Sequence, residues 1–485
     1  DVETPFAGAY ISVMATGGVP PYSSLQRLKD VPLLPNIAKA SRNMDLDVKA
    51  MGMDPVAAIE KSALHLPSRE YRDLLLGYAS TLRTGGDVIH YLITRTEIMF
   101  KDQLVKMKAM GERVGTLMEM FVAITVLATI ALYTIFTTSL AFEQFFAAGA
   151  FSTASFILFA YILLPIISVL FLYLSDASQP RYPVSEWGPY KIYALSLPVI
   201  VVLGSLLALP FMATELYGLP FTRPFTDFMM AFRTLIGMER GTEAALGLGI
   251  AFIAGTVPGA VAHSYYARRG RGLEYDISNF LRDLAETRKT GLSPEKCIES
   301  LATRLYGRLT RYLTVVSRQI RWGLPMRTVY DTFSEKVKSW LALINIYLLV
   351  DAVEVGGGDV ETLDDLANFS EMTASLEREK TVMLRPLLFI PYVGVAILLF
   401  STIVFLSYTR SVLGMFAKMP VAYAQFATLL LPPLIIEAYI SGLVTGKMSS
   451  STVSAGFKHG IFMVVAAIVV MWLSPFFSMS LGTMG

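Results

Sequence analysis

Seven long apolar stretches alternate with two long polar segments along the chain. The apolar stretches approach or exceed the roughly 20 residues that a helix needs to cross a bilayer core. They cover about 117–139, 150–174, 192–213, 245–266, 386–408, 424–445 and 460–480. The polar segments, 1–116 and 267–385, carry charges at helical spacing and lack the alternation of strands. The pattern predicts an all-α, polytopic membrane protein with about seven transmembrane helices.

This alternation also predicts four parts. We expect a first cytoplasmic helical bundle in 1–116, four transmembrane helices in 117–266, a second cytoplasmic bundle in 267–385 and three transmembrane helices in 386–485. Residue 1 is Asp rather than Met, so we also expect an upstream region before it.

Basic residues near the span ends predict the orientation of the chain. Because four crossings separate the two polar segments, both lie on one side of the membrane and the C-terminus lies on the other. The side with the polar segments has Lys106, Lys108, Arg113, Arg181, Lys191, Arg268, Arg269, Arg271, Lys380, Arg385, Lys447 and Lys458, and the other side has Arg223, Arg233, Arg240, Arg410 and Lys418. Loops rich in Lys and Arg stay in the cytoplasm, so we expect a multi-pass protein of the cell membrane with both bundles in the cytoplasm and the C-terminus outside.

Composition agrees with a membrane protein and removes several other classes. Apolar residues make up 54% of the chain and charged residues 16%, with a mean hydropathy of +0.52. The net charge of +2 gives no overall attraction to nucleic acid, and we expect no nucleic-acid partner. A single cysteine, Cys297, can form neither an intramolecular disulfide nor a multi-thiolate metal site.

The two polar segments are copies of one another. Glycine-containing turns at Gly18, Gly52 and Gly85 align in order with turns at Gly291, Gly323 and Gly357, at offsets of 273, 271 and 272 residues. Glycine accepts the left-handed conformation that ends a helix, and proline or aspartate just after it suits the next helix start. We expect structural turns at Gly52, Gly85, Gly86, Asp87, Gly291, Gly323, Gly357, Gly358 and Asp359. Each copy is therefore predicted to be an antiparallel helical bundle.

These turns carry a family resemblance. A bundle that turns at G-x-x-P, then at G-[ML]-[DP], then at G-G-D-V, repeated and followed each time by membrane helices, resembles the F domain of type II secretion and type IV pilus systems. Bacterial members usually have about three spans. The expanded pattern of this chain is more similar to archaeal platform proteins of archaella or adhesive pili, and the sequence leaves open which filament is built.

The resemblance implies a platform function. It implies a hexameric assembly ATPase and pilin- or archaellin-like subunits as partners, with the lipid bilayer around the spans and further spans upstream. Whether the platform works as a monomer or a homodimer stays open. The rival interpretation is a secondary transporter, a class that also uses internal repeats. Transporter repeats lie in the spans, however, whereas here the repeat is strongest in the polar segments.

Catalytic and cofactor-binding patterns are weak. The stretch 442–448 is one residue short of a phosphate-binding loop and has Met448 where a magnesium-binding hydroxyl is needed. We expect Gly442 and Gly446 to serve helix packing instead, like Gly255 and Gly259. The four histidines follow no metal-ligand spacing. The sequence therefore predicts no enzyme, no cofactor and no metal site.

Charge divides the second polar segment into two halves. Residues 268–327 hold 13 Lys and Arg against 6 Asp and Glu, and residues 328–385 hold 5 against 11. Within the basic half, Arg304, Arg308, Arg311, Arg318, Arg321 and Arg327 are candidates for docking the ATPase, because complementary charge steers such encounters. Two alternatives stay open: these arginines pair with the acidic half, or lipid headgroups bind nearby at Arg268, Arg269 and Arg271.

One ionisable residue lies inside a predicted span. Glu437 follows Pro432 and Pro433, and an ionised carboxylate at mid-membrane costs on the order of 3 kcal/mol. It is expected to face protein or to be protonated. The sequence leaves two roles open, a contact with a filament subunit or another span, and a structural hydrogen bond at a proline kink.

Overall fold

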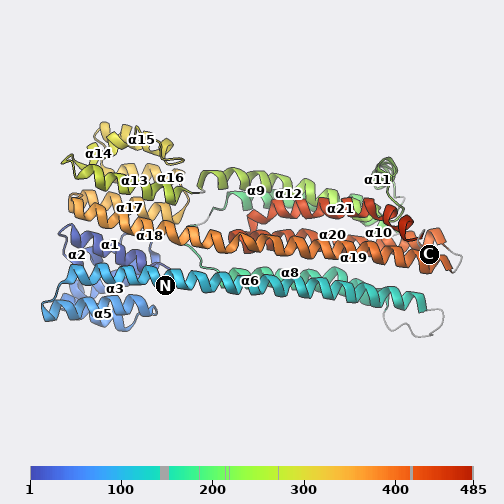
Figure 1. The fold of residues 1–485 in the computed structure, drawn as a ribbon, viewed down its shortest axis with the longest axis horizontal. Coiled ribbons are helices and arrows are strands. Elements are labelled where there is room, and N and C mark those ends of the chain that lie inside the picture. The colour runs from blue at the N-terminus through green and yellow to red at the C-terminus, as the bar shows by residue number, and fades with distance from the viewer. Residues whose placement is uncertain are drawn as a thin grey trace. The chain divides into compact units, whose positions relative to one another are not determined.

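A computed structural model describes residues 2–142, 152–184, 186–213, 215–217, 219–270, 272–415 and 419–482, and within them every regular element is a helix (Figure 1). Arg271 and Lys418, which the charge pattern used, lie outside the described residues. The all-α prediction is confirmed. The chain forms two compact units, which are described separately. Unit 1 comprises Asp1–Ala109, Pro180–Glu186 and Ala267–Thr381, and unit 2 comprises Met110–Gln179, Trp187–Tyr266 and Val382–Gly485.

Unit 1 contains both copies of the duplicated bundle. The first copy has α1 (Thr4–Thr16), α2 (Pro21–Leu28), α3 (Pro35–Met51), α4 (Pro55–Leu64), α5 (Arg69–Thr84) and the start of α6 (Val88–Phe142). The second repeats this order with α13 (Leu273–Arg288), α14 (Pro294–Leu301), α15 (Thr310–Arg321), α16 (Met326–Lys336), α17 (Trp340–Gly356) and α18 (Val360–Leu384). The six helices of one copy thus correspond one to one with those of the other.

The glycine turns lie between these helices. Gly52 ends α3 and Gly323 follows α15, with φ of 65° and 72°, a left-handed conformation that a side chain would strain. Gly85 and Gly357 end α5 and α17 in the same conformation, and Gly291 and Gly358 also have positive φ. Asp87 then starts α6, because its carboxylate accepts a hydrogen bond from the His90 N–H at 3.0 Å. Gly86 precedes Asp87, and the Asp359 carbonyl accepts from the Leu363 N–H at the start of α18.

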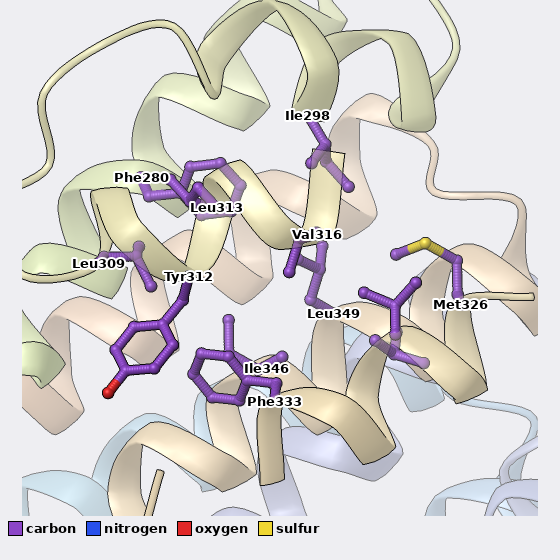
Figure 2. A pocket seen from close by; sticks show the side chains of 12 residues that line it. Phe280, Ile298, Leu309, Tyr312, Leu313, Val316, Met326, Phe333, Ile346 and Leu349 are labelled. Carbon is purple, nitrogen blue, oxygen red and sulfur yellow. The ribbon is translucent and has the colours of Figure 1, made fainter. Parts of the chain in front are cut away.

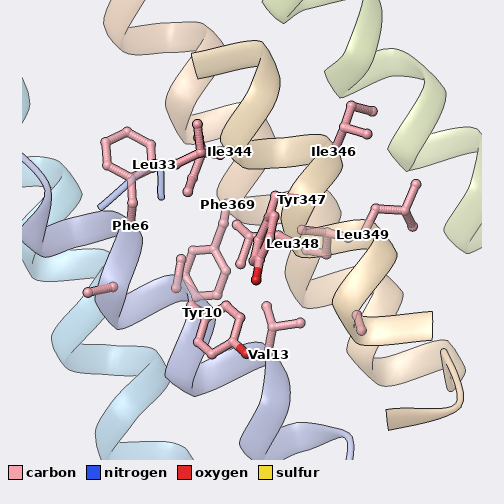
Figure 3. Close-up of a cluster of buried hydrophobic side chains, with 14 of the residues drawn as sticks. Phe6, Tyr10, Val13, Leu33, Ile344, Ile346, Tyr347, Leu348, Leu349 and Phe369 are labelled. Carbon is pink, nitrogen blue, oxygen red and sulfur yellow. The ribbon is translucent and has the colours of Figure 1, made fainter. Parts of the chain in front are cut away.

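The copies meet where α1 packs against α17 (Figure 3). Phe6 packs edge to face on Trp340 with ring centroids 4.7 Å apart, and the Trp340 indole donates to the Leu33 carbonyl at 2.7 Å. Both helices are buried over almost their whole lengths, whereas their counterparts α13 and α5 bury one face and expose the other. The contact between α1 and α17 is therefore the buried centre of unit 1.

Unit 2 contains most of the membrane helices. It begins with the remainder of α6 and continues with α7 (Thr153–Ile157), the π-helical segment η1 (Leu158–Leu163), α8 (Leu164–Ser178), α9 (Gly188–Leu207), α10 (Leu209–Met212), α11 (Arg223–Ile236) and α12 (Glu243–Gly270). After the end of α18 come η2 (Pro386–Leu388), α19 (Phe389–Met415), α20 (Met419–Ser450), η3 (Val453–Ala455) and α21 (Gly456–Gly482). Seven helices among the described residues are long and apolar enough to cross a membrane, which confirms the predicted number.

Small residues bring the membrane helices of unit 2 close together. A Cβ on Gly446 would lie 1.9 Å from the Gly456 nitrogen, and one on Gly442 would lie 2.2 Å from the Gly460 nitrogen. The backbones of α20 and α21 are thus in direct contact at the stretch that resembles a phosphate-binding loop. A Cβ on Gly255 would likewise lie 2.1 Å from the Ile200 side chain. These glycines serve helix packing.

Candidate functional site

The exposed face of α15 carries three of the predicted arginines. Arg311, Arg318 and Arg321 are exposed, and Trp322 at the end of the helix is 72% exposed. With roughly 100° between successive residues, these four side chains share one side of the helix. Arg318 and Arg321 form no ion pair with the residues that the structure describes. We call Arg311, Arg318, Arg321 and Trp322 the basic face.

The opposite side of α15 fixes this face to the core of the second copy. Leu309, Tyr312 and Leu313 are buried and Val316 and Ile320 partly buried, at the three- and four-residue steps of one helix face. Beneath them lies an apolar cavity of about 20 Å³, lined by side chains of α13, α14, α15, α16 and α17 (Figure 2). A cavity of this size has room for one water molecule and no larger ligand. The core thus orients the basic face and offers no binding pocket beneath it.

The other three predicted arginines are held differently. Arg304 lies before α15 and pairs with Asp283 at 3.2 Å, and Arg308 lies in the turn before Thr310, where its backbone N–H donates to the Asp276 carboxylate at 2.7 Å. Arg327 donates to the Tyr347 hydroxyl at 3.1 Å and lies 4.9 Å from the centre of that ring. Internal contacts therefore hold the Arg304 and Arg327 side chains, and the six-arginine docking set stays a prediction.

Part of the acidic half pairs within the second copy. Arg282 on α13 contacts Asp364 at 3.0 Å and Glu371 at 2.8 Å, both on α18. The acidic residues of α18 thus meet a basic partner that lies outside the basic face. Internal pairing accounts for Arg282 and Arg304 and leaves Arg318 and Arg321 available to another molecule.

A buried polar cluster between the two copies was not predicted. The Tyr10 hydroxyl on α1 donates to the Asp351 carboxylate on α17, and Arg27 lies 3.9 Å from the other Asp351 oxygen. Burial, together with the Asp351 charge, raises the pKa of Tyr10 well above its ordinary value. The charged residue Asp351 inside the largely apolar α17 is the sequence signal that points to such a cluster.

Glu437 lies inside unit 2 on α20. Its side chain is 4% exposed, and one carboxylate oxygen accepts a hydrogen bond from Ser168 on α8 at 2.8 Å. Further along α20, the Lys447 ammonium contacts Asp176 at 2.6 Å and the Ser451 carbonyl at 3.1 Å. The charged groups of α20 thus contact side chains of α8 and the Ser451 backbone carbonyl.

Two tyrosines that the sequence did not single out donate hydrogen bonds to backbone carbonyls beside the proline pair of α20. Pro433 has no N–H for the Leu429 carbonyl, and the Tyr161 hydroxyl donates to that oxygen at 2.7 Å. The Tyr133 hydroxyl donates to the neighbouring Leu430 carbonyl at 2.6 Å. Tyr133 lies on α6 and Tyr161 on the π-helical segment, and of the two only Tyr161 replaces a donor that a proline of α20 lacks.

The isolated histidines and the cysteine have ordinary partners. His263 contacts the Ser454 hydroxyl at 3.0 Å, and His459 contacts the Tyr392 hydroxyl at 2.7 Å. Burial raises the pKa of the Cys297 thiol, which disfavours the reactive thiolate. Over the described ranges, no three side chains of His, Cys, Asp and Glu converge as metal ligands would.

Together, these features define a class: a multi-pass, all-helical membrane protein built on a duplicated helical bundle that extends into membrane helices. The family described as "Type II secretion system (T2SS), protein F" matches residues 9–136 and again 280–407, and the chain belongs to this family. The two matches coincide with the two copies and the first membrane helix after each. The chain is therefore a membrane protein of the platform type found in type II secretion and type IV pilus systems.

One similar protein comes from an archaeon. The chain is 21% identical over 489 residues to the uncharacterized protein MJ1286 of Methanocaldococcus jannaschii, and the alignment covers 97% of this chain and 79% of that protein. No solved structure matches the chain.

Proposed function

We propose that the chain is the platform of a type IV pilus-like machine, an archaellum or an adhesive pilus. In this role it couples a cytoplasmic hexameric ATPase to the insertion of pilin- or archaellin-like subunits into a filament, without catalysis of its own. The exposed basic face of α15, fixed on a packed core, is the observation that carries the proposal. The long alignment with an archaeal protein supports the archaeal type of organisation.

Helices that continue from unit 1 into unit 2 support a mechanical role. α6 is unbroken from Val88 to Phe142, and α18 runs from Val360 to Leu384, so each crosses the boundary between the units. Within unit 2 they pack closely, because a Cβ on Gly111 would lie 3.0 Å from the Met383 sulfur. In this proposal, α6 and α18 are the helices through which work done on the bundles would reach the membrane helices.

The positive-inside pattern supports a cytoplasmic location for both bundles, with the C-terminus outside. In that orientation the basic face is accessible to an ATPase. Arg318 and Arg321 would meet acidic groups of the motor, and Trp322 would add apolar contact beside them. Arginine and tryptophan are among the residue types that most often dominate the binding energy at protein interfaces.

Charge reversal at the basic face tests the docking proposal. Arg318→Glu combined with Arg321→Glu should weaken binding of the purified ATPase at least tenfold, because the two side chains would then repel acidic groups of the ATPase. The fold should be kept, because neither arginine has an internal partner to lose. The control is Lys39→Glu with Arg42→Glu, which makes the same charge change on the exposed side of α3, the counterpart of α15 in the first copy, although Arg42 also donates to the Lys29 carbonyl at 3.1 Å. Equal binding by both variants and the unaltered protein would exclude the basic face as the docking surface.

Loss of filaments tests the platform role itself. Deletion of the gene, with complementation, should remove one type of surface filament in electron micrographs, and that type names the machine. In the complemented strain, Glu437→Gln keeps an acceptor for Ser168 and should preserve insertion while lowering the number of filaments, if the carboxylate matters to assembly. A full complement of filaments after gene deletion would remove the platform proposal.

A further inference from the structure

Helix α11 has three distinct faces. Its inner face consists of Thr226, Met229 and Arg233, which are all buried. With roughly 100° between successive residues, a polar strip of Arg223, Asp227 and Thr234 lies beside this inner face and is exposed. The remaining side is apolar and also faces outward. The helix thus buries an arginine and exposes its large apolar side chains, the reverse of what water favours.

The outward apolar strip is formed mainly by Phe228, Phe232 and Leu235. Leu235 is 84% exposed and Phe228 55% exposed. The rings of Phe228 and Phe232 stack with centroids 6.0 Å apart, so they form one continuous surface. Such a contiguous apolar surface marks contact with something other than water.

Two contacts hold α11 in its orientation, one through a buried side chain and one at its last residue. Arg233 forms a buried ion pair with Glu243 at the start of α12, with an N···O distance of 3.3 Å. The Trp472 indole on α21 donates to the Ile236 carbonyl, the last residue of α11, at 2.8 Å. Removing either member of the buried ion pair would leave a charge unpaired, so the helix cannot simply roll its apolar strip inward.

The apolar strip continues an exposed surface of the neighbouring span. α11 packs against α9, and α9 exposes Leu195, Val201 and other apolar side chains along its length, as a lipid-facing helix does. α11 connects the span Gly188–Met212 to the span that begins at Glu243, and it lies at the end of unit 2 where these two helices are joined (Figure 1). The apolar strip of α11 thus lies next to a span whose exposed side is apolar.

We propose that α11 is an interfacial membrane helix. It lies at the boundary between acyl chains and headgroups, with Phe228, Phe232 and Leu235 among the acyl chains and Arg223, Asp227 and Thr234 toward water. Amphipathic helices with one apolar and one polar exposed side take this position, about 5–10 Å into the boundary. The ion pair of Arg233 with Glu243 then locks this surface helix to the spans. This inference is independent of the ATPase and filament proposals.

Site-directed labelling in lipid vesicles tests the placement. In a Cys297→Ser background, Leu235→Cys and Phe228→Cys report the apolar strip, and Thr234→Cys, one position away on the same helix, is the matched control. Each variant carries an environment-sensitive fluorophore and is reconstituted in phosphatidylcholine and phosphatidylglycerol vesicles. Quenching is measured with aqueous iodide and with lipids that carry a nitroxide near the top or near the end of the acyl chain.

The Leu235 and Phe228 positions should emit at shorter wavelength than the Thr234 position. They should be quenched several-fold more by the shallow nitroxide than by iodide, with the order reversed at Thr234. Equal iodide quenching at all three positions would overturn the proposal in favour of a water-exposed helix. Protection of Leu235 and Phe228 from both iodide and nitroxide would overturn it in favour of a protein that covers the strip.

Discussion

The hydroxyl of Tyr10, in the first copy of the bundle, donates a hydrogen bond to the carboxylate of Asp351 in the second. The two residues are 341 positions apart, and both are buried in the packed surface between α1 and α17. Their neighbours are almost all apolar and would tolerate a small shift of one helix along the other. A directional polar contact inside such a surface favours one alignment of the copies.

Tyr10→Phe should therefore destabilise the protein. The substitution keeps the ring and removes the donor, which leaves the Asp351 carboxylate buried with the more distant Arg27. A cost of about 1–3 kcal/mol is expected for a buried acceptor that loses its partner. The measurement is unfolding in mild detergent, with Tyr22→Phe as control, because the half-buried Tyr22 hydroxyl meets only Gln26 at 3.3 Å. Equal stabilities of the two variants would argue against a structural role for the contact.

Acid should weaken the polar contacts between α2 and α3. Asp45 is buried and accepts hydrogen bonds from Lys29, Lys49 and Gln26 at 2.9, 3.1 and 2.8 Å. The bond from Lys29, against the opposing effect of burial, lowers the pKa of Asp45 below its ordinary value of 3.8. The folded state thus binds this proton more weakly than the unfolded state. The stabilisation is complete above the ordinary pKa and is lost as the pH falls through the lowered one.

Asp45→Asn measures that contribution. The difference in Tm between the unaltered protein and the variant should be constant above about pH 5 and should shrink as the pH falls below 4. Asp30→Asn is the control, since Asp30 is exposed in the turn after α2. A Tm difference that stays the same down to pH 3 would mean that the carboxylate charge of Asp45 does not contribute.

The sequence predicted the features that local chemistry determines. Gly52 and Gly323 end their helices in the conformation that glycine favours, and Leu309, Tyr312 and Leu313 are buried as their spacing indicates. Partners distant along the chain were not predicted, because neither Tyr10 nor Tyr161 carries a local sign of Asp351 or Leu429. α11 was missed for another reason. Phe228, Phe232 and Leu235 have helical spacing, but the segment is shorter than a span, and spacing alone does not separate a short surface helix from a loop.

The contact between α20 and α21 should not tolerate even one added methyl group. In Gly446→Ala the new Cβ would lie 1.9 Å from the Gly456 nitrogen, so the two helices must move apart. Overpacking of this kind costs about 1–3 kcal/mol. Gly204→Ala is the matched control, because its Cβ would lie 3.8 Å from the nearest atom, a Leu248 methyl carbon. The check is Tm in detergent, and equal values for both variants would contradict the close approach.

The tyrosine contact at the proline pair can be isolated with a double-mutant cycle. Tyr161→Phe removes the donor to the Leu429 carbonyl, and hydrogen bonds between membrane helices contribute about 0.6 kcal/mol on average. In a Pro433→Ala background the new N–H of residue 433 can donate to the same carbonyl along the helix. Loss of the Tyr161 hydroxyl should therefore cost less there than in the unaltered protein.

The quantity to compare is the coupling free energy between the two substitutions, since Pro433→Ala alone also changes packing. Tyr173→Phe on α8 is the control, because Tyr173 is 63% exposed and its hydroxyl should make no difference in either background. A Tyr161→Phe cost that is the same with and without Pro433 would show that the hydroxyl contributes independently of the missing backbone donor. A cost that disappears with Pro433→Ala would show that the hydroxyl takes the place of the missing backbone donor, which explains why a proline pair is tolerated in the middle of a span.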